Sequence, residues 1–167
     1  MTKAVIALGA NLGDARAALQ GAVQALEETV GIEVTACSQV FETDPVGGPD
    51  QPVYVNAVVL IETTLEPLRL LERANEIEEQ WHRTREVRWG PRTLDVDIVS
   101  IDDVELDTER LTLPHPRAHT RGFVLVPWLS VDPDAQLRRV PVRELLLTVD
   151  VAGVRALDPV LILRAER

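Results

Sequence analysis

Residues 88–98 have the sequence RWGPRTLDVDI, in which a loop leads directly into a strand. The Gly90-Pro91 pair breaks regular structure and indicates a turn. Residues 94–101 are mostly apolar and β-branched, which predicts a buried strand. Asp95 and Asp97 interrupt this strand two positions apart. On a strand both side chains therefore leave the same face, with their Cα atoms roughly 6.6 Å apart.

This acidic pair and the arginines before it predict a site for a polyphosphate. Two carboxylates on a half-buried face are costly unless they are paired or bind a cation. Mg²⁺, held by one or two carboxylates and by phosphate oxygens, is the simplest partner. Arginine suits phosphate because its charge is permanent and forked, and four precede the strand: Arg83, Arg85, Arg88 and Arg92. An edge strand with both acids facing water is the alternative that the local pattern leaves open.

The composition of the whole chain limits the classes of protein to consider. At 167 residues we expect one domain, residues 1–167. A net charge of −10 argues against general binding to nucleic acid or a membrane surface. The sequence has no run of about 18 apolar residues that would cross a membrane. Cys37 is the single cysteine, which excludes an internal disulfide and fits the cytoplasm. We expect a monomer that acts on small molecules.

The spacing of apolar residues predicts an α+β fold. Strands are expected at 4–8, 32–41, 53–61 and 94–101, with a helix between Asp14 and Gly31 and another that begins at Pro67. Val30 is expected on the apolar stripe of the first helix. The order βαββαβ predicts a ferredoxin-like arrangement, an antiparallel sheet with helices packed on it. C-terminal additions are expected as short strands at 104–106 and 160–163 and short helices at 121–131 and 141–147.

Several polar residues have two readings on the sequence alone. Tyr54 and Asn56 share a face at the start of a strand and could be a satisfied polar pair or part of a site. Asn75 and Glu78 share a face of the second helix and would alone be ordinary surface residues. His115 lies between two prolines, and a lone histidine is usually structural. The neighbouring arginines, at positions 110, 117 and 121, favour a ligand-binding role for it.

Four segments together resemble a known family. They are LGANLGD, FETDPVGGPDQPVYVNAV, RTREVRWGPRTLDVDI and ERLTLPHPRAHTRGF, in that order, within residues 4–129. They are similar to the 6-hydroxymethyl-7,8-dihydropterin pyrophosphokinases of folate biosynthesis. The resemblance implies that ATP gives its β,γ-diphosphate to the hydroxymethyl group of the pterin and that AMP leaves. It also implies two Mg²⁺ ions.

The resemblance assigns roles residue by residue. It implies that Asp95 and Asp97 hold the metal ions and that Arg83 and Arg92 act on the triphosphate during catalysis. For ATP it implies Asn75, Glu78, Arg85, Arg88, Trp89, Arg92, Ile98, Arg110, Thr112, His115 and Arg121. For the pterin it implies Thr43, Pro45, Val46, Gly47, Tyr54, Asn56 and Phe123.

The match has departures, and two other functions remain open. The segment between Glu78 and Trp89 is about one residue shorter than in some relatives, so the equivalence of Arg83 and Arg85 depends on where a gap is placed. Asn75 stands where a glutamine is expected. A ferredoxin-like module that binds a nucleotide without turnover would explain the fold and the arginines. A metal-dependent nucleotidyltransferase would release pyrophosphate instead of AMP.

Overall fold

The computed structural model describes residues 1–10, 14–44, 53–84, 94–157 and 160–166, with the backbone alone for residues 82–84. The elements are β1 (Thr2–Ala10), α1 (Ala15–Glu27), β2 (Ile32–Cys37), β3 (Phe41–Thr43), β4 (Tyr54–Thr63), α2 (Pro67–Thr84), β5 (Asp95–Ile101), β6 (Leu106–Asp107), β7 (Thr112–Leu113), η1 (Ala118–Thr120), α3 (Gly122–Val131), β8 (Gln136–Leu137), β9 (Val140–Pro141), α4 (Val142–Leu145), η2 (Leu146–Thr148) and β10 (Val154–Ala156). The order through β5 confirms the predicted βαββαβ arrangement, with the strand expected at 32–41 divided into β2 and β3.

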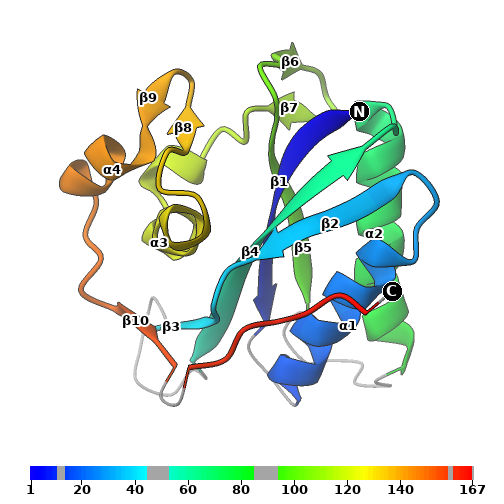
Figure 1. Cartoon of the computed structure of the whole chain (residues 1–167), viewed down its shortest axis with the longest axis horizontal. Coiled ribbons are helices and arrows are strands. Elements are labelled where there is room, and N and C mark those ends of the chain that lie inside the picture. Colours follow the sequence, from blue (N-terminus) through cyan, green and yellow to red (C-terminus); the bar gives the residue numbers. More distant parts are fainter. Residues whose placement is uncertain (11–13, 45–52, 85–93, 158–159, 167) are drawn as a thin grey trace.

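The sheet is antiparallel and has the order β10-β3-β4-β1-β5, with β2 also paired to β4. The β1–β4 pairing runs from Thr2 opposite Thr63 to Ala10 opposite Val55. Helices α1 and α2 lie on one side of this sheet, with the C-terminal end of the chain beside α1, and α3, α4, β8 and β9 lie on the other (Figure 1). Within the described residues β5 pairs with β1 alone, so its other edge is open to side chains and ligands.

Each face of the sheet has its own apolar core. On the α1 and α2 side, buried residues such as Ile6, Leu19 and Ile77 pack together. On the α3 side, Val58, Leu125 and Trp128 belong to a second cluster. The sheet is therefore buried on both faces over most of its length, and a cavity can form only where small or polar residues replace the packed ones.

The start of α1 agrees with the prediction from the sequence, and its end does not. Asp14 is the N-cap, as predicted, and its carboxylate accepts a hydrogen bond from the Ala17 N–H at 3.3 Å. The helix ends at Glu27, before the predicted stop at Gly31, whose φ is 91°. Val30 lies beyond the helix and is 92% exposed, so its place on the apolar stripe was wrong.

The C-terminal strand also differs from the prediction. The last strand is β10, which pairs with β3, whereas in residues 160–163 only Ile162 forms an isolated bridge, to Gln39. The apolar run there is half-solvated, because Ile162 is 52% exposed while Leu163 is buried. The short strand expected at 104–106 begins only at Leu106, because β6 covers Leu106–Asp107, where it pairs with β7. None of the described helices has the length and apolar composition needed to span a bilayer.

Candidate active site

A cavity of about 340 Å³ opens on the α3 side of the sheet; we call it the aromatic cavity. It is lined by Ala7, Leu8, Gly9, Thr43, Asp44, Tyr54, Asn56, Asp95, Asp97, Arg121, Phe123 and Val124. Seven of the predicted site residues therefore meet here. Six of them lie on four elements, β3, β4, β5 and α3, and the seventh, Arg121, immediately precedes α3.

Asp95 and Asp97 lie on one face of β5, as the alternation predicts. Their neighbours Val96 and Ile98 are buried in the core beneath α2, so the two acids point to the α3 side. Across the strand pair, Asp95 lies opposite Gly9 and Asp97 opposite Ala7. The two small residues leave space beside the carboxylates that a larger cross-strand neighbour would fill.

The amide of Asn56 is held in one orientation at the floor of the aromatic cavity. The Thr43 hydroxyl donates a hydrogen bond to Asn56 Oδ1 at 2.9 Å, and the side chain is buried. A Cβ on Gly9 would lie 3.0 Å from Asn56 Nδ2, so the amide nitrogen lies directly over this glycine. With its oxygen occupied by Thr43, Asn56 can offer its N–H groups to a ligand.

The walls of this cavity carry two aromatic rings. Tyr54 starts β4 and Phe123 lies in the first turn of α3. The guanidinium carbon of Arg121 lies 5.5 Å from the centroid of the Phe123 ring, a cation–π distance. Two aromatic side chains with a few fixed polar groups suit a flat heterocycle.

A second depression follows the open edge of β5; we call it the edge groove. It is lined by Leu71, Asn75, Glu78, Val96, Asp97, Ile98, Glu109, Arg110, Leu111, Thr112, His115 and Pro116. Asp97 lines both the edge groove and the aromatic cavity. A ligand in each would therefore approach the other at this carboxylate.

Most of the described residues that the family resemblance implies for ATP lie in the edge groove. The exception is Arg121, which the structure places in the aromatic cavity beside Phe123. The sequence alone missed other lining residues, including Asp44 in the cavity and Leu71 and Glu109 in the groove. Each is a near neighbour of a predicted residue, which is the signal that could have found it: Asp44 follows Thr43, Glu109 precedes Arg110, and Leu71 lies one helical turn before Asn75.

Glu78 has a structural contact that its helix position did not suggest. Its Oε1 accepts a hydrogen bond from the Val96 N–H at 2.9 Å. Val96 is on the open edge of β5 and is 2% exposed. A buried backbone N–H needs a hydrogen-bond acceptor. The Glu78 carboxylate provides the acceptor that a carbonyl of a neighbouring strand would otherwise provide.

His115 is fixed by two hydrogen bonds. Its backbone N–H donates to the Val99 carbonyl at 2.8 Å, and its ring Nδ1 accepts from the backbone N–H of Arg117 at 3.1 Å. Burial lowers the pKa of His115; the negative charge of Asp97 opposes this, and Arg121 and Arg117 add to it. The neutral ring therefore carries its proton on Nε2, which is left to donate.

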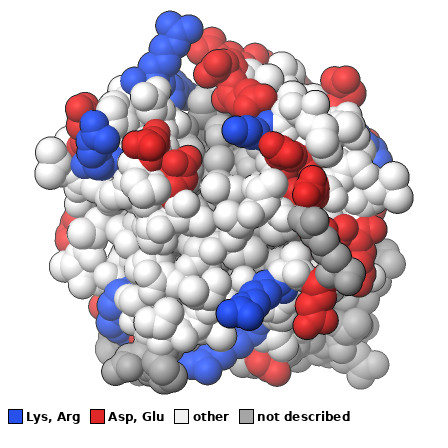
Figure 2. Space-filling view, in the orientation of Figure 1, with Lys and Arg blue, Asp and Glu red and all other residues white. Residues whose placement is uncertain are grey.

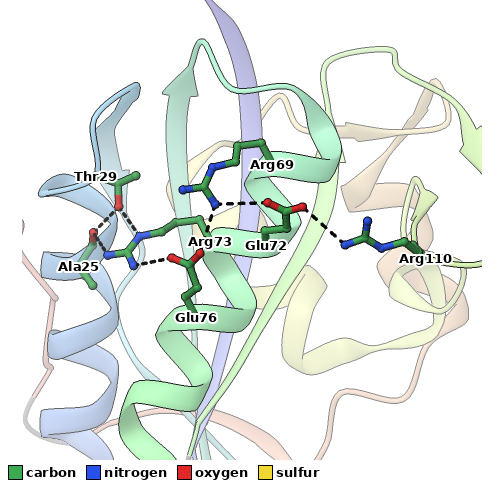
Figure 3. A network of polar contacts seen from close by, with 7 residues as sticks. All are labelled: Ala25, Thr29, Arg69, Glu72, Arg73, Glu76 and Arg110. Atoms are coloured by element: carbon green, nitrogen blue, oxygen red, sulfur yellow. Dashed lines mark hydrogen bonds and ion pairs between the residues drawn. The ribbon is translucent and has the colours of Figure 1, made fainter.

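A polar network lies along α2, at one side of the edge groove (Figure 3). Arg110 lies 3.8 Å from Glu72. The network continues through Arg69, Arg73 and Glu76 to Thr29 and the Ala25 carbonyl on and beside α1. These pairs are largely exposed, so we expect them to orient Arg110 more than to stabilise the fold.

The two aspartates fit a hard cation as a partial ligand set. Within the described residues, no group of three or more His, Cys, Asp or Glu side chains could enclose a metal ion. Mg²⁺ is usually held by one or two carboxylates and keeps waters and substrate phosphates as its other ligands. Asp95 and Asp97, open to a cavity on one rigid strand, match that donor set.

Some predicted residues lie outside the described part of the chain. They are Pro45, Val46, Gly47, Arg85, Arg88, Trp89 and Arg92, together with the side chain of Arg83. Their roles stay predictions.

Comparison with known proteins adds an independent finding. The family model for 7,8-dihydro-6-hydroxymethylpterin-pyrophosphokinase (HPPK) matches residues 5–133. Several relatives bear the name 2-amino-4-hydroxy-6-hydroxymethyldihydropteridine pyrophosphokinase. The one from Methylorubrum extorquens is 42% identical over 95% of this chain and 100% of its own length. The one from Bacillus subtilis is 48% identical over 77% of each chain.

A solved structure agrees on the fold. The crystal structure of wild-type Plasmodium falciparum HPPK-DHPS with SDX-DHP superposes with a TM-score of 0.69 over 88% of this chain, at 16% identity. The present chain spans 44% of that longer chain. The family-model match covers all four segments noted above, and by it and the two relatives the chain belongs to the 7,8-dihydro-6-hydroxymethylpterin-pyrophosphokinase family.

Proposed function

We propose that this chain transfers the β,γ-diphosphate of ATP to the hydroxymethyl oxygen of 6-hydroxymethyl-7,8-dihydropterin and releases AMP, as a step in folate biosynthesis. The observation that carries the proposal is the meeting of the aromatic cavity and the edge groove at Asp97. We further propose that residues 1–167 act as one catalytic domain, as a monomer in the cytoplasm. The single cysteine supports the last point.

The aromatic cavity is the proposed pterin site. Tyr54 and Phe123 offer ring faces, and stacking on such a face is worth about 1–3 kcal/mol per base in nucleic-acid complexes. Asn56, oriented by Thr43, supplies fixed donors to the edge of the heterocycle. Pro45, Val46 and Gly47 are proposed to complete this site.

The edge groove is the proposed ATP site. The Nε2–H of neutral His115 and the Arg110 guanidinium can donate to ATP, and Ile98 can contact an apolar face. Asn75, Glu78 and Thr112 complete the described set. Arg85, Arg88, Trp89 and Arg92 are proposed to bind ATP as well. Arg121 lines the other cavity and is proposed to contact the transferring phosphates from the pterin side.

The proposed reaction balances without a covalent enzyme intermediate. The pterin hydroxymethyl oxygen forms a bond to the β-phosphorus of ATP, and the bond from that phosphorus to the α,β-bridging oxygen breaks. AMP leaves and the hydroxyl proton is released. Asp95 and Asp97 would hold two Mg²⁺ ions, which supply charge neutralisation to the attacking and leaving oxygens. The protein's own part is positioning, with Arg83 and Arg92 proposed to neutralise phosphate charge.

A product assay tests the proposal. The purified chain is incubated with MgATP, with and without 6-hydroxymethyl-7,8-dihydropterin, and AMP is quantified by chromatography. AMP that forms only with the pterin supports the transferase. Bound MgATP without turnover would favour a regulatory nucleotide-binding module, and release of pyrophosphate would favour a nucleotidyltransferase.

A further inference from the structure

Arg155, on β10, bridges the carboxylates of Glu42 on β3 and of Asp44, the residue directly after β3. Its Nε donates to Glu42 Oε2 at 3.1 Å, and its Nη2 lies 3.1 Å from the same oxygen. Its Nη1 donates to Asp44 Oδ1 at 2.7 Å. One guanidinium group therefore engages two acids at once, which a lysine ammonium cannot do with fixed planar geometry.

The strand register explains why one arginine reaches both acids. Arg155 is directly opposite Glu42 in the β10–β3 pair, and Asp44 lies two residues beyond Glu42, so both acids leave the same side. Two like charges in this arrangement repel. Arg155 offsets that repulsion and holds the C-terminal end of β3 in one geometry.

The backbone reinforces this contact next to Asp44. The Asp44 N–H donates to the Gly153 carbonyl at 3.0 Å. A Cβ on Gly153 would lie 3.4 Å from both Cβ and Oδ2 of Asp44, an ordinary van der Waals distance, so this turn packs directly against the Asp44 side chain. Asp44 is thus held by β10 and by the turn before it, through both its main chain and its carboxylate.

This clamp acts on the wall of the aromatic cavity. Asp44 and Thr43 both line the cavity, and Thr43 fixes the amide of Asn56. β3 has three residues and its pairing with β4 ends at Thr43, opposite Tyr54, so Asp44 lies just beyond that ladder. Arg155 does not line the cavity itself. Arg155 can therefore affect a bound ligand only indirectly, through Asp44, Thr43 and then Asn56.

We propose that Arg155 is a positioning residue for the pterin, which sets the wall formed by Thr43 and Asp44 and so makes the C-terminal strand part of the pterin site. This inference rests on the proposed function. The Arg155 side chain is 49% exposed, and exposed ion pairs contribute little to stability. We therefore expect Arg155 to influence the geometry of the site and to contribute little to the free energy of unfolding.

The test compares Arg155→Ala, Arg155→Lys and the control Arg143→Ala, an exposed arginine on α4. The Kd of 6-hydroxymethylpterin is measured by fluorescence titration, and KM is measured for the pterin and for ATP. For Arg155→Ala we expect the pterin Kd and KM to rise about tenfold, because a small displacement of a site wall is costly. The ATP KM should stay within about twofold, with partial rescue by lysine.

The possible outcomes separate this inference from the proposed function. A pterin Kd within about twofold of wild type in folded Arg155→Ala would overturn the inference. So would equal increases in both KM values with a lower Tm, since those indicate a merely structural role. A wild-type chain that binds the pterin without forming AMP would contradict the proposed transferase, and the Kd series would still test Arg155.

Discussion

At the residue scale, Asp95 and Asp97 are expected to matter for activity and little for stability. Asp97→Asn and Asp95→Asn should each lower pterin-dependent AMP formation by roughly 100-fold or more, the loss typical for removing one transition-state electrostatic contact. Each change keeps the side-chain shape and removes one of two like charges, so the free energy of unfolding should change by less than about 1 kcal/mol. Urea unfolding and steady-state kinetics measure the two effects.

Asp107→Asn is the matched control, because this acid is exposed on β6 and lines neither the aromatic cavity nor the edge groove. It should retain wild-type turnover. If both variants on β5 also kept wild-type rates, the assignment of the metal ligands would be wrong.

His115 provides a pH-dependent prediction. Its pKa in the folded chain lies below the usual 6.5, chiefly because of burial. As the pH falls through 6.5, the unfolded chain takes up a proton that the folded chain does not, so the free energy of unfolding decreases. Above that range the contribution of this group is constant and fully present.

His115→Asn is the variant for this test, because its amide oxygen can still accept the Arg117 N–H. Urea unfolding of wild type and variant is followed between about pH 7 and pH 5. The variant should lose less stability over that interval. If the free energies of unfolding of the two proteins fell equally over this pH range, the effect assigned to His115 would be refuted.

At the element scale, Glu78 is expected to stabilise the open edge of β5. Glu78→Ala leaves the buried Val96 N–H without its partner and should lower the free energy of unfolding by about 1–3 kcal/mol. Glu78→Gln keeps an acceptor and should lose less. Glu144→Ala, at an exposed position of α4, is the control for removing a glutamate from a helix. Equal losses in the Ala and Gln variants would argue against the hydrogen bond to β5.

The packing of α1 on α2 yields a second prediction at this scale. A Cβ on Gly21 would lie 2.8 Å from Cζ2 of Trp81. In an open helix, Gly→Ala stabilises by about 1 kcal/mol, but here the clash should make Gly21→Ala destabilising. In a Trp81→Leu background the same change should become stabilising. A double-mutant cycle by urea unfolding measures this reversal, and additive effects would contradict it.

At the scale of the whole molecule, the sequence was sufficient to predict the βαββαβ order but not the point at which a strand is interrupted. The predicted strand at 32–41 is broken where Ser38 leaves the ladder. Its N–H donates to the Val58 carbonyl at 2.8 Å, and its hydroxyl accepts from the Val58 N–H at the same distance. A buried side chain that substitutes for strand pairing leaves no mark on the alternation of apolar residues.

The site shows the same division between local and long-range information. The shared face of Asp95 and Asp97 follows from a period of two along β5 and could be predicted. The Arg155–Asp44 contact joins residues 111 positions apart, and the Glu78–Val96 contact joins residues 18 apart. Such pairings depend on how the elements pack, which hydrophobic periodicity does not specify.

The charge of the whole molecule is also consistent with a localised site for anions. The chain carries a net charge of −10, and on the face drawn in Figure 2 acidic side chains gather in the upper part while the centre is largely uncharged. Because fields fade over about 8 Å at physiological salt, the net charge does not prevent Arg110 in the edge groove and Arg121 in the aromatic cavity from attracting an anion locally, as the proposed reaction requires.

In the proposed reaction, ATP transfers its two outer phosphates as one unit to a pterin in the aromatic cavity. The direct measurement supplies ATP labelled in both the β- and γ-phosphorus, with Mg²⁺ and 6-hydroxymethyl-7,8-dihydropterin, and separates the products by chromatography. We expect both labels to appear together on the pterin and AMP to be unlabelled. Recovery of the β label in ADP, or of both labels as free pyrophosphate, would contradict it.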